Sequence, residues 1–352
     1  MLDTAPASVK PAITARPRIV RVVIVALIVA TPLVLLTSIG IGQLSATPGE
    51  TLVVIWHRLF GVPMDSMLDT VVWQLRAPRV LLGFLVGAIL ASSGAALQAI
   101  VRNDLADPYL LGVSSGASLG AAVVLALGAA AGGALSGTVG AFVGAMGSLL
   151  LILSLVGRRE LSSSRLVLAG LTVGYFLTAA TNLVVVLTDN RDAIRAITFW
   201  MLGSLGKASW ADLPLVACFG IAAIAIFTVW GRRLDAIGLG DDAARSLGTD
   251  PHRLRRAVAV IAALGIAAAV AVSGAIGFVG LVVPHLARGM VGATHRALIP
   301  VSALTGGVLL VAADALTRTV LAPREIPLGI LTALVGTPLL MSIIRRAKHE
   351  RI

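Results

Sequence analysis

The sequence predicts an all-α polytopic membrane protein with ten transmembrane helices. Of its 352 residues, 57% are hydrophobic and only 13% are charged, and the mean hydropathy is +0.97. A soluble domain carries roughly 25% charged residues. The apolar runs are continuous rather than alternating, which excludes a transmembrane β-barrel. At about 20 residues per crossing, the chain is long enough for about ten spans and their loops.

Ten apolar runs follow one another along the chain. They cover residues 19–42, 79–101, 108–128, 137–157, 164–188, 211–230, 254–273, 275–290, 297–316 and 328–344. The seventh and eighth runs are nearly continuous across Ser273-Gly274, so a hydropathy count alone could return nine. The first run is longer than the core of a secretory signal, and we expect it to remain as a span.

The runs predict one transmembrane domain, residues 19–346, between two short tails. Residues 1–18 and 347–352 form the tails, and residues 43–75 are expected to be a mixed loop. Small residues recur at helical spacing in the spans, as in Gly116/Gly120 and Gly140/Gly144. Such spacing lets helices pack closely in lipid, and we favour packing within the chain over a dimer seam.

The distribution of basic residues favours ten spans with both termini in the cytoplasm. With that topology, 20 of the 28 Lys and Arg residues lie on the cytoplasmic side, as the positive-inside rule requires. Nine spans would place Arg345, Arg346 and Lys348 outside, against the rule. The same rule explains the net charge of +11 without a nucleic-acid partner.

One charged island, residues 231–256, interrupts the apolar runs. Its charged residues are Arg232, Arg233, Asp235, Asp241, Asp242, Arg245, Asp250, Arg253, Arg255 and Arg256. Such a segment cannot cross a bilayer, so we expect it in water at one membrane face.

The island also carries signals of local structure. We expect Asp241 to cap a short helix that runs through Leu247 and ends at Gly248. Thr249 or Asp250 would cap the next helix, with Pro251 at its first position. A structured loop indicates docking to a partner, and the alternative is a solvated connector.

The sequence lacks the residues of a nucleotide-binding or catalytic site. A phosphate loop needs Gly-Lys followed by Ser or Thr, and the Gly206-Lys207 pair is followed by Ala208. Any ATP that drives this protein must therefore bind to another chain. The single cysteine, Cys218, excludes an internal disulfide, and the histidines lack metal-ligand spacing. We expect neither an enzyme nor a bound cofactor.

Charges inside the predicted spans are rare, which weakens an ion-coupled carrier. Asp314 is the main one, with Arg318 one turn later. We interpret them as an ion pair on the helix surface rather than as a proton relay.

Several long motifs, in order along the chain, resemble the FecCD-type permeases. They are RAPRVLLGFLVGAILASSGAALQAIVRNDLADPYLLGVSSGASLG (Arg76–Gly120), SSSRLVLAG (Ser162–Gly170), FWMLGSLG (Phe199–Gly206), LGDDAARSLG (Leu239–Gly248), SGAIGFVGLVVPHLAR (Ser273–Arg288) and PLGILTALVGTPLL (Pro327–Leu340). That family comprises the membrane subunits of ABC importers for ferric siderophores, haem and cobalamin. The resemblance covers roughly Leu75 to Arg346, and is much less specific for substrate than for family.

The resemblance implies the type II ABC importer permease fold, in a bacterial cytoplasmic membrane. It implies a second permease subunit, two ATPase subunits that hold ATP and Mg, an extracytoplasmic solute-binding protein, and alternating access. We expect ferric siderophores as the substrate because that branch is broad. Haem and cobalamin are the alternatives, and an ion-coupled secondary transporter is the competing class.

The motifs also imply three groups of site residues. Arg76, Arg79 and Arg318 match outer-face arginines, expected to be exposed, that pair with carboxylates of the binding protein. Asn103, Leu105, Ser163 and Ser164 match cytoplasmic gate positions. Asp241, Asp242, Ala243, Ala244, Arg245, Leu247 and Gly248 match the helix that couples to the ATPase. The chain departs from the family's Asn-Pro-Leu, because Asp104 stands at the proline position.

Overall fold

A computed structural model describes residues 17–42, 46–61, 66–131, 137–157 and 162–349. Its elements are α1 (Pro17–Gly40), α2 (Pro48–Leu59), α3 (Met67–Asp69), the π-helical turn η1 (Thr70–Arg76), α4 (Ala77–Val101), the 3-10 turn η2 (Pro108–Leu111), α5 (Val113–Ala131), α6 (Gly137–Val156), α7 (Ser163–Val186), α8 (Arg191–Met201), α9 (Leu213–Val229), α10 (Gly231–Gly238), α11 (Asp241–Ser246), α12 (Pro251–Ser273), α13 (Val279–Val291), α14 (His295–Thr319) and α15 (Leu328–His349). No strand occurs in these ranges. Residues 1–16 of the expected N-terminal tail and 350–352 of the C-terminal tail lie outside them.

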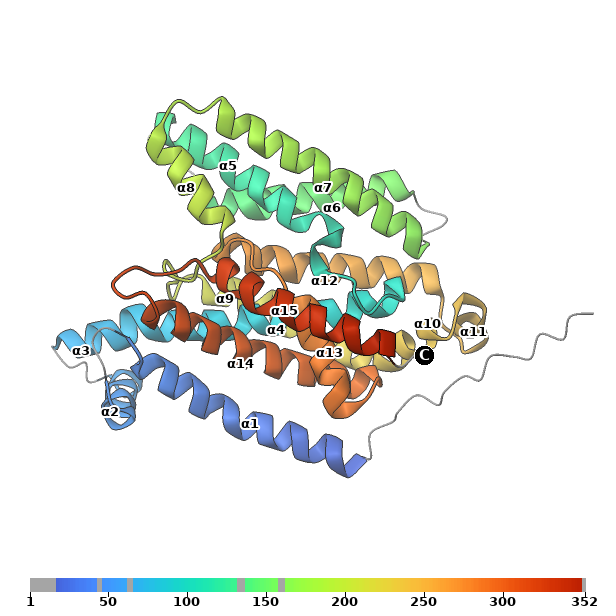
Figure 1. The fold of residues 1–352 in the computed structure, drawn as a ribbon, viewed down its shortest axis with the longest axis horizontal. Helices are drawn as coiled ribbons and strands as arrows, with labels where there is room; N and C mark the ends of the chain where they lie inside the picture. The colour runs from blue at the N-terminus through green and yellow to red at the C-terminus, as the bar shows by residue number, and fades with distance from the viewer. Residues whose placement is uncertain (1–16, 43–45, 62–65, 132–136, 158–161, 350–352) are drawn as a thin grey trace, which may run out of the picture.

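Helix α4 forms the centre of the bundle. It packs against α14, α12, α13 and α9, and nearly all of its residues are buried. Helices α5, α6, α7 and α8 form a second group, and α12 contacts both α4 and α6 (Figure 1). The all-α fold expected from the sequence is confirmed.

Glycine allows the helices to approach closely, as their spacing predicted. A Cβ atom on Gly116 would lie 2.4 Å from the carbonyl oxygen of Gly144, and one on Gly120 would lie 2.0 Å from that of Gly140. The α5–α6 contact therefore depends on these small residues, which serve packing within the chain.

Each of the ten apolar runs contains one of the longer helices. Among the described residues, six helices are long and apolar enough to cross a membrane. The count is seven if α9 and α10, which meet at a 60° bend, form one span. Shorter apolar helices occupy 113–128, 279–291 and 328–342, so the number of ten spans stays a prediction. Three helices of eight or more residues were missed: α2 lies in the expected loop 43–75, the amphipathic α8 follows α7, and α10 begins the charged island.

The uncertain boundary between the seventh and eighth runs is a real break. Helix α12 ends at Ser273, and α13 begins at Val279. The Tyr109 hydroxyl donates to the carbonyl of Ile276 at 2.9 Å and accepts from the same residue's N–H at 2.9 Å. The N–H of Ser204 bonds the Ser273 carbonyl at 2.8 Å. The break is thus held by neighbouring loops, which satisfy its free backbone groups.

Candidate functional site

The charged island, residues 231–256, folds into α10, α11 and the first turn of α12 at one end of the bundle (Figure 1). Gly248 adopts the left-handed conformation, with φ +77°. The Gly248 N–H donates to the Arg245 carbonyl at 2.9 Å, and the Thr249 N–H donates to the Ala244 carbonyl at 2.8 Å. This pair of bonds is the Schellman motif. The expected end of the short helix at Gly248 is therefore confirmed.

The start of α12 also follows the expectation. Asp250 accepts from the backbone N–H groups of His252 at 2.9 Å and Arg253 at 3.1 Å, and Pro251 occupies the first helical position. The bond from Arg253 is the main reason that the pKa of Asp250 lies below its usual value.

The expected capping role of Asp241 is wrong. Gly240 precedes α11 at its N-cap position, and no side chain caps that helix. The Asp241 carboxylate instead binds the guanidinium groups of Arg255 and Arg102. Hydrogen bonds from two arginines stabilise a carboxylate more than hydrogen bonds from exposed backbone N–H groups do.

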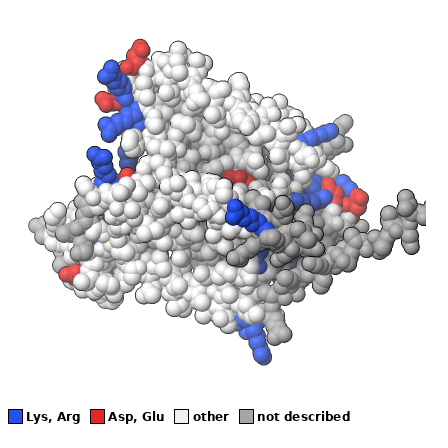
Figure 2. Space-filling view, in the orientation of Figure 1, with Lys and Arg blue, Asp and Glu red and all other residues white. Residues whose placement is uncertain are grey.

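The remaining surface of α11 is open. Asp242 is fully exposed and forms an ion pair with Arg245 at 2.8 Å, and Leu247 is also exposed. Ala244 is buried beneath them. Figure 2 shows that charged side chains gather toward the two ends of the helices, with a broad uncharged surface between them. A partner in water could therefore contact α11 directly.

The two expected gate segments meet at the end of α4. The Asn103 side chain accepts from the Leu105 N–H at 2.9 Å, which shapes the turn after α4. The Ser163 hydroxyl donates to the Ile100 carbonyl at 2.9 Å, while Ser164 is exposed. Sequence motifs 60 residues apart are therefore adjacent in space.

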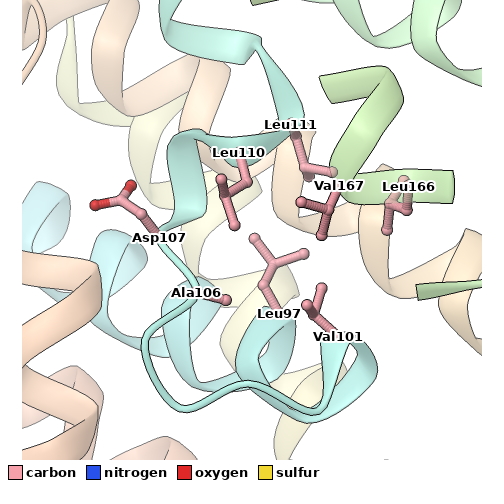
Figure 3. Close-up of a pocket in the computed structure, with 8 residues that line it drawn as sticks. All are labelled: Leu97, Val101, Ala106, Asp107, Leu110, Leu111, Leu166 and Val167. Atoms are coloured by element: carbon pink, nitrogen blue, oxygen red, sulfur yellow. The ribbon is translucent and has the colours of Figure 1, made fainter. Parts of the chain in front are cut away.

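A small apolar cavity lies just inside this junction (Figure 3). Its volume is about 10 Å³, and its walls are Leu97, Val101, Ala106, Asp107, Leu110, Leu111, Leu166 and Val167. Space of this size holds about one water molecule. The walls contributed by α4, by the segment that leads into η2 and by α7 therefore lie close together.

Asp104, at the family's proline position, forms an ion pair. Its carboxylate lies 3.3 Å from the guanidinium of Arg288 on α13. The Asn103 side chain stabilises the turn after α4, and the charge of Asp104 adds a link to α13.

The three arginines at the opposite end are not exposed, contrary to expectation. Arg76, Arg79 and Arg318 are 7%, 9% and 7% exposed. Arg76 donates to the carbonyls of Ile39 at 3.2 Å and Gly40 at 3.1 Å, at the end of α1. Helix ends leave such carbonyls without partners, and buried arginines satisfy them here.

Asp314 joins the other two arginines. Its carboxylate lies 2.9 Å from Arg79 Nη2 and 3.1 Å from Arg318 Nε. The expected Asp314–Arg318 pair is thus present, but it is buried between α14 and α4 rather than on a helix surface. Arg318 also donates to the Ser38 and Ile41 carbonyls.

This arginine cluster opens toward water at one point. Glu325 lies 3.0 Å from Arg79, and its side chain is 48% exposed. It lines a cavity of about 400 Å³ together with Arg76, Arg79 and Arg318. A carboxylate from another molecule could reach the cluster through this opening.

Sequence reasoning missed four residues at these sites: Arg102, Arg255, Tyr109 and Glu325. Each acts through a partner distant in sequence; Arg102 and Asp241, for example, are 139 positions apart. The one sequence signal for Arg255 was its position at the start of an apolar run. A basic residue there is equally explained by the positive-inside rule, so this signal did not predict an ion pair.

Comparison with known proteins agrees with the geometry. The model of the FecCD transport family matches residues 26–346. The chain belongs to the FecCD transport family. The resemblance carried by the sequence motifs is confirmed, and the family consists of transport permeases rather than catalytic enzymes.

Relatives of this family match almost end to end. The hemin transport system permease protein HmuU of Yersinia pestis is 37% identical, over 91% of this chain and 95% of the relative. The Fe(3+)-citrate import system permease protein YfmD of Bacillus subtilis is 33% identical, over 89% and 90%. An inward-facing metal-chelate-type ABC transporter shares the fold with a TM-score of 0.80 and 30% identity, over 94% of this chain and all of that one.

Proposed function

We propose that this FecCD-family chain forms the translocation pathway of an ATP-driven importer for ferric siderophores and works by alternating access. The observation that carries the proposal is the family match over residues 26–346, combined with α11 at the water-exposed end of an apolar bundle. Support for a metal chelate as the substrate comes from the Fe(3+)-citrate relative and the metal-chelate-type transporter.

The partners follow from the same proposal. Two ATPase subunits would bind ATP and Mg and dock on the exposed side of α11, where Asp242 and Leu247 lie. A second permease subunit would complete the pathway, in a bacterial cytoplasmic membrane with ten spans and both termini inside. This topology places the charged island in the cytoplasm, as the positive-inside rule favours.

A solute-binding protein would dock at the other end. Its carboxylates would approach the arginine cluster through the opening beside Glu325. Because Arg79 already binds Asp314 and Glu325, we propose that a docking carboxylate exchanges with Glu325 rather than meeting a free arginine.

Haem and cobalamin are the alternative substrates, since the relatives include a hemin permease from Yersinia pestis and a cobalamin permease from Halobacterium salinarum. The test is uptake of labelled ferric siderophore, haem and cobalamin by cells with and without the gene. We expect deletion to abolish ferric siderophore uptake and the gene on a plasmid to restore it. Loss of haem or cobalamin uptake alone would overturn the substrate assignment.

A further inference from the structure

The two neighbouring acidic residues of α11 face in opposite directions. Asp242 is fully exposed, whereas Asp241 lies against the bundle. The Asp241 carboxylate is bonded by Arg255 through both oxygens, with distances of 2.8 Å (Nη1–Oδ2) and 2.6 Å (Nη2–Oδ1). A bidentate pair of this kind fixes orientation as well as distance.

Arg255 extends this contact to the end of α4. The residue is 1% exposed, and its Nε donates to the Ile100 carbonyl at 3.2 Å. The same carbonyl accepts the Ser163 hydroxyl at 2.9 Å. One backbone oxygen is therefore shared by α12, which carries Arg255, and by the first residue of α7. Ile100 is in the last turn of α4, where carbonyl groups lack partners within the helix.

Arg102 reinforces the junction from the other side. It binds Asp241 and donates from Nε to the Ile237 carbonyl of α10 at 2.9 Å. Its φ of +57° is uncommon for a residue with a side chain, so the surrounding contacts hold it in place. Burial and the nearby charge of Arg255 lower the pKa of Arg102, and Asp241 supplies the opposite charge.

We infer that Asp241 and Arg255 are positioning residues that carry displacement of α11 to the turn after α4 and to the start of α7. The inference rests on the proposed function, because it gives the route by which ATPase movement at α11 reaches the gate segments. A displacement of α11 cannot leave Arg255 in place without breaking the partly buried, bidentate ion pair between Asp241 and Arg255. It therefore moves the Ile100 carbonyl and the Ser163 hydroxyl bound to it.

The test uses the complete importer in proteoliposomes, with the chain, its ATPase and its binding protein. Asp241→Asn keeps the shape of the side chain but removes the charge. Asp241→Asn combined with Arg102→Gln returns the net charge of the junction to its parent value of +1, which limits the effect on folding. Arg253→Met is the matched control, since Arg253 lies on α12 two residues before Arg255, is exposed, and forms an ion pair with Asp250 at the start of that helix.

We expect both Asp241 variants to assemble with the ATPase and hydrolyse ATP, while uptake per ATP falls about tenfold. Asp241→Glu should restore part of it, and Arg253→Met should match the parent. A second readout replaces Cys218 by Ala and places spin labels at positions 105 and 164. ATP should change their distance in the parent but not in the Asp241 variants.

The outcomes distinguish failure of the Asp241–Arg255 inference from failure of the proposed function. If the parent importer shows ATP-driven uptake and the Asp241 variants keep the same uptake per ATP and the same distance change, the inference is wrong and the proposed function stands. If the parent neither assembles with an ATPase nor imports, the proposed function itself fails. Loss of ATPase assembly in both Asp241 variants would also contradict the inference, because Asp241 would then act in docking.

Discussion

Arg79 and Asp314 are 235 positions apart, and their side chains form a buried ion pair with a distance of 2.9 Å between Nη2 and Oδ1. The pair joins α4 to α14, the most extensive helix contact in the bundle. Arg318 completes the cluster from the next turn of α14. The outer arginines are thus part of the internal structure, and Glu325 is the point where they meet water.

Asp314→Ala should destabilise the protein strongly. It leaves Arg79 and Arg318 buried without their shared carboxylate, at a cost of about 3–5 kcal/mol. Thermal unfolding of the purified chain in lipid nanodiscs measures the loss. Glu325→Gln is the control: its side chain is half exposed, so about 1 kcal/mol or less is expected. Equal destabilisation by both variants would contradict the assigned burial.

Gly94→Ala should disrupt the packing of α4 on α13. The added Cβ would lie 1.9 Å from the carbonyl oxygen of Gly280, and we expect a loss of about 1–3 kcal/mol or more. Gly147 also lies inside a helix, but no atom lies within 4 Å of the place that its Cβ would take. Gly147→Ala should therefore stabilise the protein by up to about 1 kcal/mol. The yield of folded protein in detergent compares them, and equal yields would refute the close α4–α13 contact.

Tyr109→Phe should loosen the break between α12 and α13. The variant removes the hydroxyl that bonds both the N–H and the carbonyl of Ile276, at a cost of about 1–3 kcal/mol. Hydrogen exchange should increase at residues 274–278 and remain unchanged in α9. Tyr175→Phe, on the exposed face of α7, is the control and should change neither stability nor exchange.

Reversing the exposed surface of α11 should weaken ATPase docking. Asp242→Lys and Leu247→Arg alter side chains that face away from the bundle, and we expect the affinity to fall on the order of tenfold to a hundredfold. Titration of the ATPase onto the chain in nanodiscs measures it. Asp242→Glu and Leu247→Met keep charge and polarity and should bind like the parent. Unchanged binding by the reversed variants would remove the docking role.

Local features were predictable from the sequence because their signals are local. The apolar runs predicted the helices, and the glycine spacing predicted close helix packing within the chain, which occurs between α5 and α6. Gly248 marked the end of α11, and Pro251 marked the start of α12. The expected cap at Asp241 failed because its partners lie 14 and 139 positions away. The predicted exposure of Arg79 was wrong for the same reason, because no sequence pattern connects Arg79 to its partner Asp314. Helix α8 was missed because its amphipathic pattern is too short to resemble a span.

The requirement for ATP tests the central claim most directly. Proteoliposomes would contain this chain alone or with its ATPase and binding protein, with ATP or an ion gradient supplied, and uptake of labelled ferric siderophore would be measured. The account predicts uptake only with all three proteins and ATP. Uptake by this chain alone, driven by an ion gradient, would contradict it.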